Sequence, residues 1–370
     1  MKIVHTLQFL GIGGLEKIVY QLAIEQKKQG HQVDVYVYDY EQSWVEFFQN
    51  NGITVITPPL KKSGYDFNLF KRFEDDLFSY DIIHTHDLNP LMYLGPLILF
   101  KKIFAKKRPK LIHTTHGLDH LENYKRAKLY ENIVSRFADR IVAVSEKIGK
   151  FYLNQVGLSH KKVIVIQNGI AIFKNEITDE LRNEKKRWIC LRHDLTEDRP
   201  IVLSLSRIVP LKDQLFLINC LKLRTNLQFI IAGPPSDPEY YKKCEELLSA
   251  NIKMIGSQEK VSDYNLGSDL YVSASTHEGI PVAVLEAMVV QTPVLVSDIP
   301  GHTTLNQFGE SVSIYKIHDQ NDFLFQLDLI LNQKEKFQAK AKNARGIIEY
   351  HFSSEAMSNQ YLQVYRDSLS

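Results

Sequence analysis

Short apolar runs rich in β-branched residues alternate with helix-length amphipathic segments along almost the whole 370-residue chain, and this alternation constrains the fold most strongly. The strands expected in the first half are Lys2–Leu7, Gln32–Tyr38, Ile53–Thr57, Asp81–His84, Lys110–Thr114, Arg140–Val144 and Val163–Ile166. The helical patterns between them include Leu15–Gln29, Asn68–Ser79, Tyr124–Ala138 and Glu146–Val156. A β-α-β-α order predicts an α/β protein with parallel sheets covered by helices on both faces.

A charged segment interrupts this order and divides the chain. Residues 175–199 are crowded with charge and end at Pro200, which predicts a linker or boundary helix. The alternation then resumes, with strands expected at Ile201–Ser206, Leu227–Ala232, Ile252–Ile255, Asp269–Ser273 and Pro293–Ser297. We therefore expect two Rossmann-like, doubly wound domains, 1–175 and 176–350, facing one another across a cleft, with a helix at 351–370.

Charge and cysteine content exclude several classes of protein. The formal net charge of +2 argues against a nucleic-acid partner, since general nucleic-acid binders are markedly basic. Cys190, Cys220 and Cys244 are scattered singly, which suggests neither a zinc site nor a disulfide framework. The chain enters a strand pattern at its second residue, without the apolar stretch of a signal peptide. These features fit a cytoplasmic protein.

Arg207 and Lys212 lie at the junction of an expected strand and an expected helix. The strand ends at Ser206, and Asp213 is a suitable N-cap for the helix that follows. Two cations beside the positive end of a helix dipole can bind a diphosphate, or neutralise charge on a departing nucleoside diphosphate. Two basic residues near a loop are more often simply solvated, so alone they do not define a site.

A pair of glutamates brackets the start of a later helix. Glu278 is followed by Gly279, Ile280 and Pro281, and proline suits the first turn of a helix. Glu286 lies about one and a half turns further on, within an otherwise apolar stretch. Carboxylates are rarely buried without a partner, so we interpret both as acceptors for sugar or ribose hydroxyls. The alternative is a capping acid and one surface glutamate.

Together these motifs resemble the C-terminal domain of glycosyltransferase family 4 enzymes of the GT-B fold. The resemblance rests on Ser-Arg-x4-Lys-Asp at 206–213 and on Glu-Gly-Ile-Pro with a second glutamate at 278–286. It extends over nearly the whole chain through shorter segments at 13–16, 84–87, 115–117, 144–146, 168–170 and 231–233. It implies that the last helix, with Tyr365, crosses back onto the N-terminal domain.

The resemblance also implies roles for the residues of the C-terminal domain. Arg207 and Lys212 would hold the diphosphate, Glu286 the ribose hydroxyls, and Glu278 the donor sugar, as a catalytic residue. The backbone of Gly279, Ile280 and Pro281 would line the sugar pocket. Gly233 would end the strand that faces the nucleotide.

In the N-terminal domain, the implied functional residues are Gly13 and Gly14 of a glycine loop that contacts the nucleotide sugar. His116 would lie across the cleft near the reacting carbon, as a second catalytic residue. The family retains the configuration of the transferred sugar and requires no metal, so we expect no cofactor beyond a UDP- or GDP-sugar as co-substrate. The acceptor would be a glycan or lipid-linked glycan, as in surface polysaccharide or lipopolysaccharide biosynthesis.

Two other functions remain as alternatives. Gly11-Ile12-Gly13-Gly14 follows a strand and opens a helix, as in NAD-dependent oxidoreductases, but Glu16 stands where the dinucleotide motif requires glycine. A catalytically silent GT-B subunit that serves binding or assembly is the other alternative. Loss of its chemical residues would be expected, whereas all four charged residues of the C-terminal motifs are present.

Two further clusters have both a functional and a structural interpretation. Several histidines and two aspartates could suggest a metal site: His84, His86, His113, His116 and His120, with Asp87 and Asp119. No H-E-x-x-H spacing occurs among them, and most loop histidines are structural or solvated, so we assign a role only to His116, through the family resemblance. Residues 91–110 are apolar and then strongly basic, which fits either a solvated surface or a peripheral contact at the inner face of the membrane.

Overall fold

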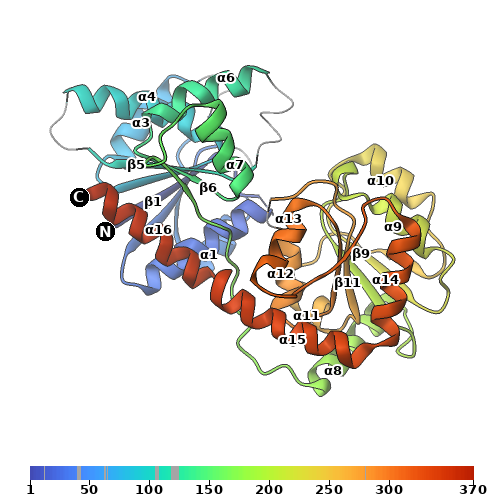
Figure 1. Ribbon diagram of the computed structural model, residues 1–370. Helices are drawn as coiled ribbons and strands as arrows, with labels where there is room; N and C mark the ends of the chain where they lie inside the picture. The colour runs from blue at the N-terminus through green and yellow to red at the C-terminus, as the bar shows by residue number, and fades with distance from the viewer. Residues whose placement is uncertain are drawn as a thin grey trace. The chain divides into compact units, whose positions relative to one another are not determined.

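The computed structural model describes residues 1–11, 13–39, 43–61, 64, 66–104, 108–117, 125–279 and 281–370. The chain divides into two compact units, coloured along the sequence in Figure 1. The first unit contains Met1–Ala171 together with Ser354–Ser370, and the second contains Ile172–Ser353. The polypeptide therefore begins and ends in the same unit.

The first unit is built on a seven-stranded parallel sheet with the order β3-β2-β1-β4-β5-β6-β7. Its strands are β1 (Lys2–Leu7), β2 (Gln32–Val37), β3 (Thr54–Ile56), β4 (Ile82–His86), β5 (Lys110–Thr115), β6 (Arg140–Ala143) and β7 (Val163–Val165). Every residue of β4 is buried, as expected for a central strand covered on both faces.

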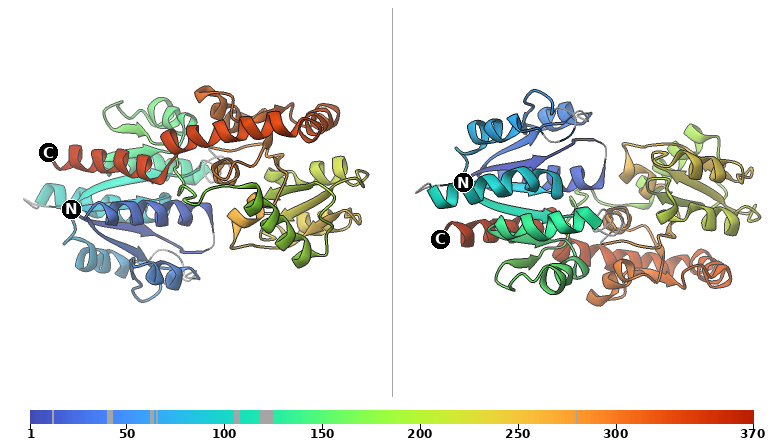
Figure 2. Two further views of the ribbon diagram at one scale, coloured as in Figure 1. Left: turned by 90° about the horizontal axis from the view of Figure 1, so that it is seen from below. Right: turned by 90° about the horizontal axis from the view of Figure 1, so that it is seen from above.

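Helices cover both faces of this sheet (Figures 1 and 2). On one face α1 (Gly14–Lys28) lies beside α16 (Ser354–Leu369), the last helix of the chain. The other helical segments are α2 (Val45–Asn50), α3 (Asn68–Leu77), α4 (Leu88–Phe104), α6 (Lys125–Val134), η1 (Ser135–Phe137), α7 (Glu146–Lys150) and the π-helical turn η2 (Phe151–Gln155). The contact between α1 and α16 places the C-terminal helix on the N-terminal sheet.

The second unit is built on a six-stranded parallel sheet with the order β10-β9-β8-β11-β12-β13. Its strands are β8 (Ile201–Leu205), β9 (Gln228–Ala232), β10 (Ile252–Met254), β11 (Leu270–Ser273), β12 (Val294–Ser297) and β13 (Ser313–Tyr315). Its helical segments are α8 (Asp179–His193), η3 (Pro210–Lys212), α9 (Gln214–Leu221), α10 (Pro238–Glu245), α11 (Val261–Leu266), α12 (Val282–Val289), α13 (Pro300–Thr303), η4 (Thr304–Phe308), α14 (Gln320–Asn332) and α15 (Lys334–His351).

Strand order reverses once in each sheet, between β1 and β4 and between β8 and β11. In doubly wound folds the loops at the carboxyl ends of the strands diverge at such a point and leave room for a ligand. The segments after β1 and β4, and those after β8 and β11, are therefore where binding residues are expected.

The predicted α/β class is confirmed, and the expected strands agree with the observed ones to within about two residues. Strand β13 was not predicted, because its three residues include Ser313 and follow a polar stretch without a clear apolar run. The charged segment before Pro200 contains α8, whose Trp188 packs edge-to-face on Tyr264 of α11. It is therefore a helix of the second unit.

Candidate functional site

The loop after β8 presents the two predicted cations. Arg207 is exposed, whereas the next residue, Ile208, is fully buried and fixes the loop to the core. The turn η3 follows and ends at Lys212. Asp213 caps α9, as predicted: its side chain accepts a hydrogen bond from the backbone N–H of Phe216 at 3.3 Å. Lys212 therefore stands immediately before a capped helix N-terminus.

The loop after β11 brings Glu278 to Lys212. The backbone N–H of Thr276 donates to the carbonyl of Leu211 at 2.9 Å, which fastens this loop to η3. Glu278 Oε1 accepts hydrogen bonds from Lys212 Nζ and, at 2.8 Å, from Ser275 Oγ. Only about one sixth of each charged side chain is exposed, 16% for Lys212 and 15% for Glu278. Two residues far apart in the sequence thus form one largely buried ion pair.

Helix α12 begins one residue later than predicted. Pro281 is its N-cap rather than a residue of its first turn, with an extended ψ of 110°. Its carbonyl accepts from the backbone N–H groups of Val284 and Leu285, at 3.1 and 3.2 Å, so it caps the helix through its backbone. Glu286 lies on α12 and is half-buried.

Tyr271 of β11 lies near both glutamates. Its hydroxyl is buried and donates to the carbonyl of Leu205 at 3.2 Å. Burial raises the pKa of Tyr271, and the charges of Glu278 and Glu286 raise it further. The structure therefore brings Lys212, Glu278 and Glu286 to the carboxyl ends of β8 and β11, at the strand reversal.

The predicted glycines of this unit differ in their surroundings. A Cβ on Gly233 would lie 1.8 Å from the carbonyl oxygen of Ser206, so the close approach of the two strand ends requires glycine there. Gly279 has no such constraint: a Cβ would meet no neighbouring atom within 4 Å. Ile280, predicted to line the sugar pocket, lies outside the described residues.

His302 is a residue of this region that sequence reasoning missed. It is fully buried on α13, and its Nδ1 donates to the carbonyl of Ser297 at 2.9 Å. Burial lowers the pKa of His302 to about 4, while the charge of Glu278 acts to raise it and that of Lys212 to lower it. The preceding Gly301 packs on the backbone of the Glu278 loop, where a Cβ would lie 2.5 Å from the Glu278 carbonyl oxygen. No spacing in the sequence distinguishes His302 from other loop histidines.

In the first unit, Gly13 and Gly14 lie where β1 gives way to α1. Gly13 is the N-cap of the helix, with extended backbone, and Gly14 is its first residue. A Cβ on Gly13 would overlap the carboxylate of the Glu16 side chain, whereas one on Gly14 would meet nothing within 4 Å. Neither packing nor a positive φ explains the glycine at position 14.

His116 follows β5 and is half-buried. Its backbone N–H donates to Asp87 Oδ1 at 3.2 Å, and its ring Nε2 lies 3.0 Å from Nδ1 of His86. Burial lowers the pKa of His116, and the nearby Asp87 acts in the opposite direction. The side chain at this position is therefore a neutral imidazole at pH 7.

Behind His116, a row of polar groups continues into the core. His86 Nε2 lies 3.0 Å from His5 Nδ1, and His5 Nε2 lies 2.9 Å from Gln26 Oε1 of α1. Gln26 Nε2 in turn donates to the hydroxyl of Tyr365 on α16, at 3.3 Å. Each of these residues except His116 is at least 98% buried. The row therefore connects a predicted site residue to two helices on the face of the sheet.

His84 forms a second branch of this network. Its Nδ1 lies 2.7 Å from the Tyr365 hydroxyl, and its Nε2 lies 2.7 Å from Thr114 Oγ1. Thr114 Oγ1 is also 3.2 Å from the hydroxyl of Tyr361. The signal that sequence reasoning missed is register: His84 and the histidine two residues later share one face of β4, and His5 of β1 lies beside His84.

Three of these histidines are close enough to hold a metal ion. One ring nitrogen each from His5, His84 and His86 lies within 4.8 Å of the others. However, all six of their ring nitrogens have hydrogen-bond partners in the structure. Hydrogen bonding alone accounts for the cluster. His120 and Asp119, two residues of the predicted cluster, lie outside the described residues.

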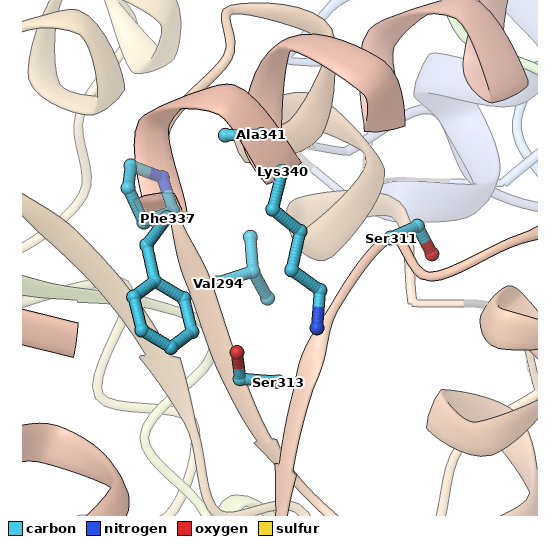
Figure 3. A pocket seen from close by; sticks show the side chains of 7 residues that line it. Val294, Ser311, Ser313, Phe337, Lys340 and Ala341 are labelled. Carbon is cyan, nitrogen blue, oxygen red and sulfur yellow. The ribbon is translucent and has the colours of Figure 1, made fainter. Parts of the chain in front are cut away.

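A small recess lies in the second unit near the amino ends of β12 and β13, at the edge of the sheet opposite to Lys212 and Glu278 (Figure 3). Its lining includes Val294, Ser313, Phe337 and Lys340, and it has no room for a water-sized molecule. Lys340 Nζ donates to the carbonyl of Val312 at 3.0 Å. This recess is a packing defect rather than a binding site.

Comparison with known proteins identifies the class that this fold and these residues define. Residues 12–172 match the family described as Glycosyltransferase Family 4, and residues 191–346 match Glycosyl transferases group 1. Two doubly wound units carrying these two domains make the chain a glycosyltransferase of the GT-B fold. It belongs to glycosyltransferase family 4.

Relatives and solved structures agree with this assignment. The chain is 26% identical over 280 residues to the capsular polysaccharide biosynthesis glycosyltransferase CapH of Staphylococcus aureus, covering 72% of each chain. It is 23% identical over 305 residues to the Escherichia coli UDP-Gal:alpha-D-GlcNAc-diphosphoundecaprenol alpha-1,3-galactosyltransferase, covering 78% of this chain and 76% of the relative. Anabaena HepE, solved with UDP and glucose, superposes with a TM-score of 0.85 at 19% identity over 99% of each chain.

Among the described residues, none of the helices combines the length and the apolar character needed to cross a membrane. Helix α4 carries Lys101 and Lys102 in its last turn. The three cysteines are buried and unpaired.

Proposed function

We propose that this glycosyltransferase retains the anomeric configuration of a sugar that it transfers from a nucleotide diphosphate sugar to a glycan or lipid-linked acceptor. The observation that carries the proposal is the Lys212–Glu278 ion pair at the strand reversal of the second sheet, beside a capped helix N-terminus. Lys212 would then supply a cation for phosphate and Glu278 a carboxylate for sugar hydroxyls within a single site.

A UDP-sugar is the donor that we propose. The Escherichia coli relative is named for UDP-Gal, and Anabaena HepE has been solved with UDP and with UDP-glucose. Arg207 and Lys212 would neutralise the diphosphate, and the exposed position of Arg207 leaves its guanidinium free to reach a ligand from solvent. Glu286 would accept the ribose hydroxyls.

Glu278 would bind hydroxyls of the transferred sugar. The Ser275 hydroxyl and the Lys212 ammonium hold its Oε1, which leaves Oε2 to accept from the ligand. The backbone of Gly279 and Pro281 would line the same pocket. The open surroundings of Gly279 support this assignment, since packing within the chain does not require glycine there. Gly233, by contrast, is explained by packing.

The transfer itself would proceed on one face of the sugar. The acceptor hydroxyl oxygen forms a bond to the anomeric carbon while the bond from that carbon to the diphosphate oxygen breaks. The hydroxyl proton passes to the departing diphosphate, so the step needs no general base from the protein. We propose that neither a protein nucleophile nor a metal ion takes part. The two cations stabilise the negative charge that develops on the leaving group. Gly13 and Gly14 would admit the donor close to the backbone, and His116 would contact the transferred sugar.

The acceptor is proposed from the names of relatives. One acts on GlcNAc-diphosphoundecaprenol, and a Campylobacter jejuni relative is named for N,N'-diacetylbacillosaminyl-diphospho-undecaprenol. Another belongs to capsular polysaccharide biosynthesis. We therefore propose a lipid-linked acceptor in surface polysaccharide biosynthesis.

A donor panel tests the proposal. Thermal unfolding of the purified chain would be measured with UDP-, GDP- and ADP-sugars and with NAD, and transfer would be followed with a diphosphoundecaprenol-linked acceptor, with and without EDTA. We expect stabilisation by a UDP-sugar, EDTA-insensitive transfer and retained configuration in the product's anomeric NMR signal. Stabilisation by NAD alone would favour an oxidoreductase, and donor binding without transfer to any acceptor would favour a silent subunit.

We also propose that α4 and α6 contact the membrane surface. Figure 1 shows the two helices next to one another in the first unit, where they are in contact. Their exposed large apolar residues are Leu99, Phe100, Leu129, Tyr130 and Ile133. Lys102 is exposed at the end of α4. Apolar side chains beside basic ones suit an anionic bilayer; residues 105–107 of the basic stretch lie outside the described residues.

Vesicle sedimentation tests this contact. Phe100→Ser combined with Lys102→Glu should weaken binding to vesicles containing anionic lipid by about tenfold, since one basic residue alone contributes roughly 1 kcal/mol. The matched control is Phe325→Ser, because Phe325 is 63% exposed on α14 of the other unit. Equal binding of both variants would remove the proposed contact.

A further inference from the structure

The row of imidazoles behind His116 has a defined direction of hydrogen bonding. A neutral imidazole carries one N–H donor and one bare nitrogen acceptor. Burial lowers the pKa of His5 to about 4, holds that of His86 far below its usual value, and lowers that of His116. All three rings are therefore neutral at pH 7, and each hydrogen bond between them fixes which nitrogen carries the proton.

Gln26 determines where the row begins. Its Oε1, which can only accept, lies 2.9 Å from His5 Nε2, while its Nε2 donates to the Tyr365 hydroxyl at 3.3 Å. His5 therefore carries its proton on Nε2 and offers a bare Nδ1. His86 lies 3.0 Å from that nitrogen and must donate to it through Nε2, which leaves its own Nδ1 bare.

His116 is the last ring of the row. His116 Nε2 lies 3.0 Å from the bare Nδ1 of His86, so His116 donates through Nε2. We propose that Gln26, acting through His5 and His86, is a positioning residue that fixes the Nε2–H tautomer of His116 and so presents its Nδ1 as an acceptor for a hydroxyl of the transferred sugar. The contact of His116 with the transferred sugar rests on the proposed function, whereas the tautomer does not.

The Tyr365 branch is consistent with this direction. The Tyr365 hydroxyl accepts from Gln26 Nε2 and donates to His84 Nδ1 at 2.7 Å. His84 then donates through Nε2 to Thr114 Oγ1, also at 2.7 Å. One amide thus orients both branches, since its oxygen serves one branch and its nitrogen the other. Gln26 lies on α1 and Tyr365 on α16, and the two helices are in contact.

The tautomer can be read directly by NMR. In protein labelled with ¹⁵N-histidine, two-bond proton–nitrogen correlation at pH 7.5 distinguishes protonated from bare ring nitrogens, and His116→Gln assigns the signals of His116. We expect a protonated Nε2 and a bare Nδ1. A protonated Nδ1, or signals averaged between two tautomers, would overturn the proposal. The wild-type protein is sufficient for this measurement.

A pair of variants then separates positioning from structural support. Gln26→Met keeps the length of the side chain but removes the acceptor, so the His116 signals should average and kcat should fall about tenfold, the loss expected for one hydrogen bond. Tyr361→Phe removes a buried hydroxyl of the same network, 3.2 Å from Thr114 Oγ1, and should leave the His116 tautomer unchanged.

Two results would count against the role of Gln26: an unchanged tautomer in Gln26→Met, or an equal fall of kcat in both variants. UDP-induced thermal stabilisation should be the same in both variants and in the wild type. If the protein transferred no sugar, the proposed function would fail while the tautomer measurement stood, so the two failures are distinguishable.

Discussion

The two units carry their candidate site residues in opposite electrostatic states. In the second unit, Lys212 and Glu278 are charged, paired and partly exposed to solvent. In the first unit, His116 is neutral and ends a row of buried neutral rings. A charged pair can exchange its internal partner for a diphosphate and a sugar with little change in structure. A neutral row can only present a fixed donor or acceptor, and so suits orientation more than charge stabilisation.

The largest expected effect concerns the charged pair. Glu278→Ala should lower transfer by about 100- to 1000-fold, the loss typical of removing one aimed polar group from a reacting centre. The fold should persist, because the carboxylate is 15% exposed and water can replace it at Lys212. Steady-state kinetics and circular dichroism measure the two quantities.

A matched control for this variant is Glu239→Ala. Glu239 pairs with Lys243 at 2.8 Å on α10, but its side chain is 83% exposed. Its loss should leave turnover within about twofold, as for other surface pairs. Equal activity of the two variants would show that the Lys212–Glu278 pair is structural.

The second expected effect concerns acid. The folded pKa of His5 is about 4, below the usual 6.5, so the unfolded chain takes up a proton first as pH falls. Stability from this group is complete above pH 6.5 and declines below it, by about 3 kcal/mol at pH 4. His84 and His86, with pKa values far below the usual range, add to the loss in the first unit.

The chain contains two tryptophans, which report the units separately. Trp44 lies in the first unit and Trp188 in the second. Urea unfolding by fluorescence of Trp188→Phe and Trp44→Phe, between pH 7.5 and 4.5, should give the larger fall in midpoint for the first unit. In the second unit, His302 has a pKa of about 4. Its loss of stability in acid should be smaller than the combined loss from His5, His84 and His86 in the first unit. A larger fall in the urea midpoint of the second unit would contradict the expectation that acid destabilises the first unit more.

A smaller effect should follow from Tyr365→Phe. This change leaves His84 Nδ1 and Gln26 Nε2 without their buried partner, which costs about 2 kcal/mol of unfolding free energy. Because no charge is involved, we expect the loss to be the same in 50 mM and 500 mM salt, in contrast to a surface ion pair. Denaturant titration at the two salt concentrations measures it, and a strong salt dependence would count against a neutral network.

The smallest effect should come from two glycines. Gly14→Ala and Gly279→Ala should fold normally, because no neighbouring atom lies within 4 Å of either added Cβ. If the donor approaches the backbone there, its KM should rise about tenfold, as expected for the loss of roughly 1.4 kcal/mol of binding. Gly346→Ala, equally open and within α15, is the control. An unchanged KM in both variants would remove the backbone contact.

Sequence patterns predicted the sheets well, because buried parallel strands form continuous apolar runs whatever their neighbours. They predicted the cap at Asp213 for a similar reason, since capping is a local property. The family resemblance assigned Lys212 and Glu278 to one site but did not predict their ion pair, because only the strand order brings the two loops together. The roles of these residues remain predictions.

The buried network was outside the reach of these patterns. Gln26 occupies an ordinary helical position, and its partners come from β1 and from a helix more than 300 residues away in the sequence. His302 was missed because its burial depends on α13 packing near the Glu278 loop. Contacts of this kind depend on tertiary structure, and no local periodicity records them.

The return of the last helix to the first unit has a consequence for synthesis on the ribosome. The second unit is continuous, from Ile172 to Ser353, and can fold as soon as it has emerged. The first unit is translated earlier, yet Gln26 and His84 lack their Tyr365 partner until α16 has left the exit tunnel. Although its sheet can assemble early, the unit begun first is therefore completed last.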